Sequence, residues 1–173
     1  MRVVAGTAKG RRLQAPAGDD TRPTADRVRE ATFNALNSLG ALDGSVLDLF
    51  AGSGALGIEA LSRGATSATF VDTDGRALAA VRANLEATGL EGSASVVRSD
   101  ALRFLAGGAR AFDLVLLDPP YAFGDEEWAV LLEALESGIA VLESDREVPV
   151  PAPWTVLRSK RYGGTVVSIV RRA

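Results

Sequence analysis

The fold of this chain is decided by the stretch Val46-Leu47-Asp48-Leu49-Phe50-Ala51-Gly52-Ser53-Gly54-Ala55-Leu56-Gly57-Ile58-Glu59. Its apolar beginning is typical of a buried β-strand, and the glycines that follow leave little room for side chains. From Ala55 the spacing becomes helical and continues to about Arg63, where Gly64 is a stop signal. A strand, a glycine turn and a helix in this order predict a nucleotide-type binding site, where backbone N–H groups approach a ligand closely.

The sequence on both sides alternates between strand-like and helix-like segments. Continuous apolar runs predict further strands, and a last pair is typical of an antiparallel hairpin. Such alternation predicts an α/β domain with a mostly parallel sheet covered on both faces, and no linker divides residues 1–173 into two domains. The expected strands are Ala68–Asp72, Ser95–Arg98, Phe112–Leu117, Ile139–Leu142, Trp154–Arg158 and Thr165–Val170, and the expected helices run from the N-cap Thr24 to Gly40, from Gly75 to Thr88 and from Glu126 to Glu136.

Composition limits the available chemistry. The chain has 173 residues, 47% of them hydrophobic and 24% charged, which is the ordinary globular range. It contains no cysteine and no histidine, so disulfides, thiolate nucleophiles, imidazole bases and the usual zinc sites are excluded. The beginning of the chain does not match a signal peptide, and no apolar run is long enough to span a membrane. We therefore expect a cytoplasmic protein.

The charges are segregated along the chain. The net charge of −3 combines +3 in residues 1–30 and +5 in residues 158–173 with −11 between them. The runs Arg2–Ala5 and Arg11–Ala15 are consistent with a hairpin or a basic arm, and we expect residues 1–24 to form such an extension. Basic ends around an acidic body suggest contact with a nucleic-acid backbone, although chance clustering on a solvated surface explains the charges equally well. The candidate RNA-binding residues are Lys9, Arg11, Arg12, Arg27, Arg29, Lys160 and Arg161.

Carboxylates follow three consecutive predicted strands. Asp72 ends the second strand, Asp100 follows the third and Asp118 the fourth, while Asp48 lies in the first strand before the glycine turn. Ligands of open α/β sheets bind outside the carboxyl ends of the strands, so we expect these acids to face one crevice. Asp72 is placed to accept hydrogen bonds from ribose hydroxyls. Two simpler interpretations remain, in which the glycines serve packing alone and the acids cap the helices that follow.

Asp118-Pro119-Pro120-Tyr121 is the most distinctive segment after the glycine turn. Two prolines cannot continue a strand, so the chain must turn stiffly there and leave the carboxylate and a proline carbonyl as fixed acceptors. A planar base with an exocyclic amino group fits these acceptors, with its ring stacked on Tyr121. A nicotinamide cofactor could use the same glycine turn and Asp72, but it would give this segment no purpose.

The segments Leu47–Gly54, Glu59–Gly64 and Asp118–Tyr121 resemble the S-adenosylmethionine-dependent methyltransferases of the RsmD family. The more specific segment Arg22-Pro23-Thr24-Ala25-Asp26-Arg27-Val28-Arg29-Glu30 is similar to the signature of that family. The resemblance extends over nearly the whole chain. It implies a Rossmann-like class I methyltransferase fold with a seven-stranded sheet, and methylation of the 2-amino group of one guanine in 16S ribosomal RNA, within an assembled or assembling small subunit.

The resemblance also implies roles for individual residues. The glycine turn would hold the methionine part of the cofactor, Asp72 the ribose, and Asp100 with Ala101 the adenine. Asp118 to Tyr121 would be the catalytic segment that holds the target base. The family more often has a glutamate at the position of Asp72, and an aromatic residue near Thr7-Ala8. The full set of candidate cofactor-binding residues is Asp48, Ala51, Gly52, Ser53, Gly54, Asp72, Thr73, Asp100, Ala101, Arg22 and Thr24.

Direct transfer of a methyl group from a sulfonium to the amino nitrogen requires positioning and electrostatics more than covalent help from the protein. The residues leave open whether Asp118 takes the proton. They also leave open a methyltransferase acting on adenine or on a protein amide, a non-catalytic RNA-binding assembly factor, and an oxidoreductase. We expect the enzyme to be a monomer.

Overall fold

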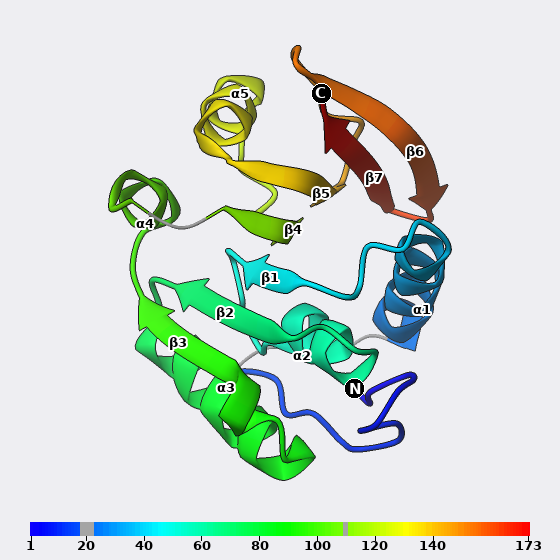
Figure 1. The fold of residues 1–173 in the computed structure, drawn as a ribbon, viewed down its shortest axis with the longest axis vertical. Coiled ribbons are helices and arrows are strands. Elements are labelled where there is room, and N and C mark those ends of the chain that lie inside the picture. The colour runs from blue at the N-terminus through cyan, green and yellow to red at the C-terminus, as the bar shows by residue number, and fades with distance from the viewer. Residues whose placement is uncertain (18–22, 109–110) are drawn as a thin grey trace.

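The computed structural model describes residues 1–17, 23–108 and 111–173, and a seven-stranded sheet forms its centre (Figure 1). The order across the sheet is β3-β2-β1-β4-β5-β7-β6. The first five of these strands run parallel, whereas β7 is antiparallel to both β5 and β6. The predicted α/β fold with its C-terminal antiparallel hairpin is therefore confirmed. The strands are β1 (Ser45–Asp48), β2 (Ser67–Asp72), β3 (Ala94–Arg98), β4 (Phe112–Leu117), β5 (Ser137–Ser144), β6 (Trp154–Tyr162) and β7 (Thr165–Arg172).

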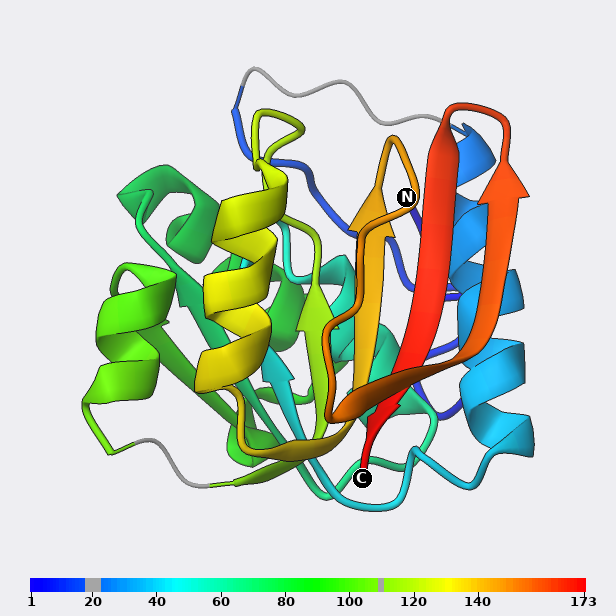
Figure 2. The ribbon, with the colours of Figure 1, turned by 90° about the horizontal axis from the view of Figure 1, so that it is seen from above.

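Five α-helices within the described residues cover the two faces of the sheet (Figures 1 and 2). Leu114 and Leu116 of β4 belong to the core shared with the first three helices, while Val115 and Leu117 belong to the core shared with the last two. Successive side chains of a strand point to opposite faces of the sheet, so this alternation shows that β4 is buried on both faces. The helices are α1 (Pro23–Ser38), α2 (Ala55–Ser62), α3 (Gly75–Thr88), α4 (Ala101–Ala106) and α5 (Asp125–Ala134).

Three details differ from the sequence-based expectations. Helix α1 begins at Pro23, so Thr24 lies inside the first turn and is not the N-cap. Proline favours the first helical position because its fixed φ suits the helix and its missing N–H is not needed there. The short helix α4 was not predicted, because six residues are too few for a clear helical period. Strands β5, β6 and β7 extend beyond the predicted runs, because pairing with their neighbouring strands continues through their polar ends.

The N-terminal arm is a hairpin that lies against α2. Its two runs pair through Val3 N–H to Arg11 O at 2.9 Å, which is the hairpin that the sequence allowed. The buried carboxylate of Glu59 accepts hydrogen bonds from the backbone of Val4 and Ala5, at 2.9 and 3.1 Å. Through these bonds the arm is fixed to the helix that follows the glycine turn.

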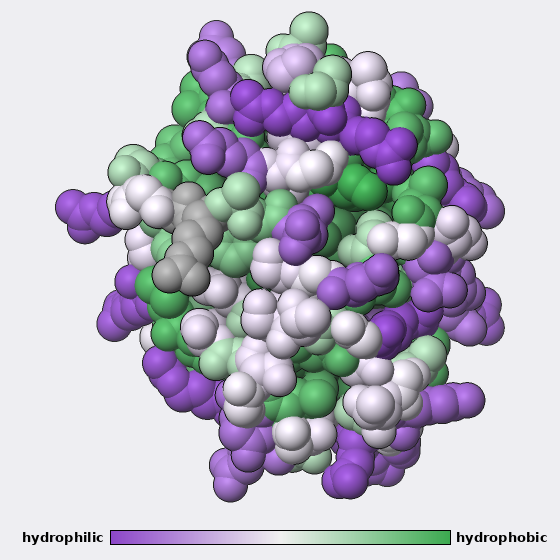
Figure 3. All heavy atoms as spheres, viewed as in Figure 1, coloured by the Kyte–Doolittle hydropathy of each residue, from purple (hydrophilic) through white to green (hydrophobic). Residues whose placement is uncertain are grey.

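The molecular surface is mixed in character. The space-filling view shows hydrophilic side chains around the margin and hydrophobic ones in smaller groups between them (Figure 3). This mixture is ordinary for a globular domain. Within the described ranges, every helix is too short or too polar to cross a membrane.

Candidate active site

A cavity of about 1060 Å³ opens at the carboxyl ends of the parallel strands. It lies where the strand order reverses between β1 and β4, which is the usual ligand site of an open α/β sheet. The three acids that follow β2, β3 and β4 all line this cavity, as their positions predicted. The predicted residues that the structure brings together there are Ala51, Gly52, Ser53, Asp72, Thr73, Asp100, Ala101, Asp118, Pro119, Pro120 and Tyr121.

The glycine turn uses each of its glycines differently. Gly52 has φ +55°, and a Cβ added there would point into open space, so the turn leaves room for a ligand beside the backbone. Gly54 caps α2 with φ +81° and lies behind the cavity lining, where a Cβ would meet Val81 at 3.2 Å. At Gly57 a Cβ would be 2.4 Å from the ring of Phe70. The packing interpretation therefore holds for Gly54 and Gly57, whereas the open space at Gly52 leaves room for a ligand to approach the backbone.

The structure does not place Asp48 among the residues that line the cavity, contrary to the sequence-based prediction. The sequence grouped it with the cofactor-binding residues, but its carboxylate is buried beneath the turn and does not line the cavity. Its Oδ2 accepts a 3.0 Å hydrogen bond from Gly57 N–H, while its Oδ1 has no partner among the described residues. Burial raises the pKa of Asp48 to about 8, against the opposing effect of the Gly57 bond. Asp48 supports the start of α2.

Asp72 is oriented by the backbone on both sides. Its Oδ2 accepts from Gly52 N–H at 2.9 Å and its Oδ1 from Asp74 N–H at 2.9 Å. Each oxygen keeps a second lone pair for a ligand hydroxyl. Asp100, by contrast, is exposed and accepts from Arg103 N–H at 3.1 Å, so it both caps α4 and lines the cavity.

The segment after β4 forms the opposite wall. Tyr121 is 61% exposed and Asp118 opens into the same cavity, so neither points into the protein interior. Pro120 O accepts a 3.0 Å hydrogen bond from Phe123 N–H, whereas Pro119 O has no partner among the described residues. The Phe123 ring packs edge-on against Phe50, with 5.7 Å between the ring centroids. The fixed turn predicted from two prolines is thus present and held by an aromatic anchor.

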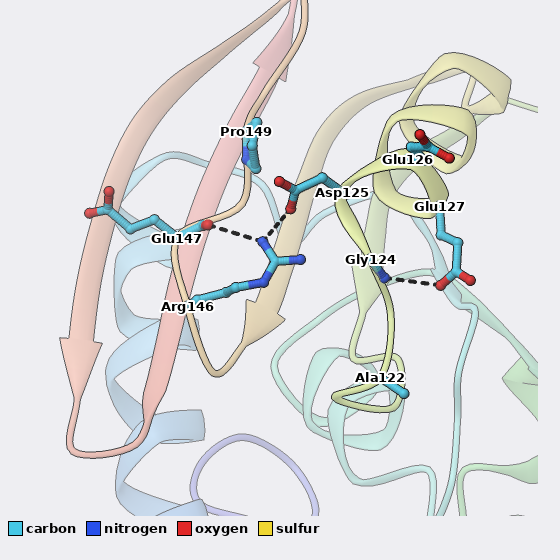
Figure 4. A pocket seen from close by; sticks show the side chains of 8 residues that line it. All are labelled: Ala122, Gly124, Asp125, Glu126, Glu127, Arg146, Glu147 and Pro149. Atoms are coloured by element: carbon cyan, nitrogen blue, oxygen red, sulfur yellow. Dashed lines mark hydrogen bonds and ion pairs between the residues drawn. The ribbon is translucent and has the colours of Figure 1, made fainter.

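Arg146 joins this segment to the loop that follows β5 (Figure 4). Its guanidinium donates to Phe123 O at 3.2 Å and to Glu147 O at 3.3 Å. It also forms an ion pair with Asp125 at the start of α5. Arg146, Asp125 and Glu147 line a second cavity, of about 640 Å³. Arg146 therefore fixes the far end of the loop that carries Asp118.

Glu143 is a cavity residue that the sequence reasoning missed. It follows the apolar run Ile139–Leu142, so the rule applied to the other strand-end acids would have found it. Burial, the nearby Asp118 and Asp48 raise the pKa of Glu143, and Arg29 opposes this shift. Asp118 is exposed to the cavity, and desolvation by the surrounding protein atoms raises its pKa as well. The site therefore disfavours full ionisation of its two carboxylates.

The position of Arg29 also differs from the sequence-based prediction. It was grouped with the RNA-binding residues, but it is only 3% exposed and lines the cavity. It pairs with Asp26 at 2.9 Å, approaches Glu59 at 3.7 Å and donates to the carbonyl of Arg2. Its charge is thus used inside the protein. Arg22 and the side chain of Thr24 lie outside the described residues.

The other basic candidates are exposed, and they lie on α1, on β6 and on the N-terminal arm, where Arg11 donates to Ala87 O of α3 at 3.4 Å. The arm contacts α1 through a hydrogen bond from Arg29 of the helix to the carbonyl of Arg2. Strand β6 also lies beside α1, because Lys160 of β6 and Thr32 of α1 line the same small cavity. In Figure 1 the arm and the β6–β7 hairpin lie on either side of this helix. The exposed residues of this band, which we call the basic band, are Lys9, Arg11, Arg12, Arg27, Lys160 and Arg161.

The cavity fits the cofactor that the resemblance implied. The open space beside Gly52 accepts a ligand close to the backbone, and Asp72 presents oriented acceptors to hydroxyl groups. The fold and the site together define an S-adenosylmethionine-dependent methyltransferase, and two similar solved structures are named as a methyltransferase and a methylase.

Comparison with known proteins gives the family. A family model described as "Conserved hypothetical protein 95" matches residues 1–171. The chain is 42% identical to YlbH of Bacillus subtilis (strain 168) over 99% of both chains. It is 40% identical to ribosomal RNA small subunit methyltransferase D of Escherichia coli (strain K12), covering 99% of this chain and 90% of that one. The solved structure of yhhF from Escherichia coli has a TM-score of 0.85 and 38% identity, with 99% of this chain and 97% of that chain covered. The chain belongs to the RsmD family of rRNA methyltransferases.

Proposed function

We propose that this enzyme methylates the exocyclic 2-amino group of one guanine in 16S ribosomal RNA, in the cytoplasm, as a monomer acting on an assembled or assembling small subunit. The observation that carries the proposal is the common cavity of the glycine turn and the Asp118–Tyr121 segment. The relative from Escherichia coli is named for small-subunit ribosomal RNA. Helix α1, which carries Arg27 of the basic band, also lines this cavity through Ala25 and Arg29, and the exposed residues of the band supply positive charge for an RNA backbone.

The residues divide the work between cofactor and base. Gly52 and Ser53 would hold the methionine part of S-adenosylmethionine, Asp72 its ribose, and Asp100 with Ala101 its adenine. When bound, this cofactor supplies a methyl group already activated on a sulfonium. The protein therefore needs to position the acceptor nitrogen.

Asp118 and the Pro119 carbonyl would accept the two amino hydrogens of the guanine. These bonds favour a pyramidal nitrogen with a free lone pair, which is otherwise conjugated with the ring. Tyr121 would stack on the base, a contact worth about 1–3 kcal/mol. Because its pKa is raised, Asp118 also accepts the proton released on transfer more readily than an ordinary aspartate does.

A methyl-transfer assay tests the proposal. Small subunits and naked 16S RNA from a strain lacking the enzyme are incubated with labelled S-adenosylmethionine, and the modified base is mapped by mass spectrometry. We expect N2-methylguanine at a single position, with more product on subunits. Methylated adenine, a methylated protein amide or no product would contradict it. Calorimetry should detect binding of S-adenosylhomocysteine and none of NAD.

A further inference from the structure

Glu143 lies beside Asp118 at the carboxyl edge of the sheet. Leu117 of β4 is opposite Leu142 of β5, so Asp118 and Glu143 are the next residues in register on adjacent parallel strands. Leu117 and Leu142 both pack on the α4–α5 side, and the pleat directs the following pair to the other side. Both acids line the same cavity. Two carboxylates thus face one ligand from neighbouring strands.

This pair needs hydrogen-bond donors. Asp48 on β1 adds a third acid on the same side of the sheet, and Arg29 on α1 is the cation that opposes them. Arg29 Nη2 donates to Asp26 and to the carbonyl of Arg2, and no hydrogen bond or ion pair among the described residues joins Arg29 to Asp118 or Glu143. A ligand that brings two adjacent N–H groups would satisfy both Asp118 and Glu143, because hydrogen bonds donated to a carboxylate stabilise its ionised form, which can only accept.

We propose that Glu143 determines base specificity by accepting the N1–H of the target guanine while Asp118 holds the adjacent 2-amino group. The inference rests on the proposed function, in which the substrate is guanine. Guanine presents a donor at N1 next to its amino group, whereas adenine presents a lone pair at N1 next to its own. That lone pair would face a carboxylate, and a site built around a particular hydrogen bond rejects bases that cannot form it.

The test compares guanine with 2-aminopurine at the methylated position of reconstituted small subunits. 2-Aminopurine keeps the 2-amino group but has no N1–H. We expect the wild-type enzyme to prefer guanine in kcat/KM by roughly 10- to 100-fold, the range for a hydrogen bond to a charged group. The Glu143→Gln enzyme should lose most of this preference, because its amide can donate to N1 of 2-aminopurine or accept from N1–H of guanine. Glu143→Asp keeps the charge and should retain the preference at a lower rate.

Glu147→Gln is the matched control, since Glu147 is exposed on the loop after β5 and lines the second cavity, not the cavity that holds Asp118 and Glu143. It should leave the guanine preference unchanged. Affinity for S-adenosylhomocysteine and the melting temperature show that each variant is folded. An unchanged guanine preference in Glu143→Gln would overturn the inference, whatever the turnover rate of that variant. If Glu143→Gln does not fold, a folded Glu143→Asp enzyme without the guanine preference would also overturn it. A wild-type enzyme that yields no methylguanine would overturn the proposed function itself, before any variant is compared.

Discussion

The backbone N–H of Gly52 donates a 2.9 Å hydrogen bond to the carboxylate of Asp72, a residue at the end of the next strand. This bond joins the floor of the glycine turn to the acid that would hold the ribose. Asp74 N–H fixes the other carboxylate oxygen. The acid and the turn therefore have their geometry before a ligand arrives, which reduces the entropy lost on binding.

We expect Asp72→Ala to weaken cofactor binding more than turnover. The substitution removes the acceptors for the ribose hydroxyls, and a hydrogen bond to a charged group contributes about 1.5–3 kcal/mol. Kd for S-adenosylhomocysteine, measured by calorimetry, should rise by roughly 10- to 100-fold, while kcat at saturating cofactor changes little. Asp43→Ala, an exposed acid at the other end of the sheet, should leave Kd unchanged. An unaltered Kd for Asp72→Ala would remove this residue from the cofactor site.

Asp118→Ala should have the opposite profile. It removes an acceptor that contacts the reacting amino group, so we expect kcat to fall by roughly 10²- to 10³-fold. Cofactor affinity should stay within about threefold of the wild type, since Asp72 and the glycine turn are untouched. Single-turnover methyl transfer and calorimetry measure the two effects. Near-native turnover of Asp118→Ala would show that Asp118 does not hold the base. Asp145→Asn removes another exposed acid and serves as the control.

The strands, the glycine turn and the strand-end acids could be predicted because each depends on local sequence. Apolar runs identify buried strands, and the carboxyl end of a parallel strand fixes where an acid such as Asp72 must face. The roles of Asp48 and Arg29 could not be predicted. Asp48 differs from Asp72 only in its depth below the turn, and Arg29 turns inward because Glu59, thirty residues away, is buried beneath it. Such long-range pairing leaves no mark in a helical pattern.

The N-terminal arm gives a prediction about stability. Gly6 has φ +88°, and a Cβ there would lie 1.8 Å from the backbone oxygen of Ser62. Gly6→Ala must therefore displace the arm from α2, and we expect a loss of roughly 2–4 kcal/mol in the free energy of unfolding, measured in urea. Gly10→Ala is the matched control. Gly10 also has positive φ, at +82°, but a Cβ there meets nothing within 4 Å. A smaller loss in Gly6→Ala than in Gly10→Ala would contradict the docking of the arm.

Arg146 is expected to act as a positioning residue for the loop after β4. Arg146→Ala removes the hydrogen bond to Phe123 O and the ion pair with Asp125, so the Asp118–Tyr121 segment is less well held. We expect kcat to fall by roughly 3- to 30-fold with cofactor affinity unchanged, because a positioning defect affects the base and not the glycine turn. Arg82→Ala on the exposed side of α3 serves as the control. Equal losses in kcat and in cofactor affinity would instead indicate a general loss of structure.

Asp48 makes stability depend on pH. Burial raises the pKa of Asp48 from 3.8 to about 8, so between these values the folded protein keeps a proton that the unfolded chain releases. The contribution of Asp48 to stability is therefore complete below pH 3.8, falls as the pH rises, and is lost above about pH 8. For one proton the slope reaches about 1.4 kcal/mol per pH unit. Asp48→Asn cannot ionise but retains an acceptor for Gly57 N–H, so its free energy of unfolding should decline less between pH 5 and pH 8. Parallel declines in urea denaturation of the wild type and Asp48→Asn would show that Asp48 ionises normally in the fold.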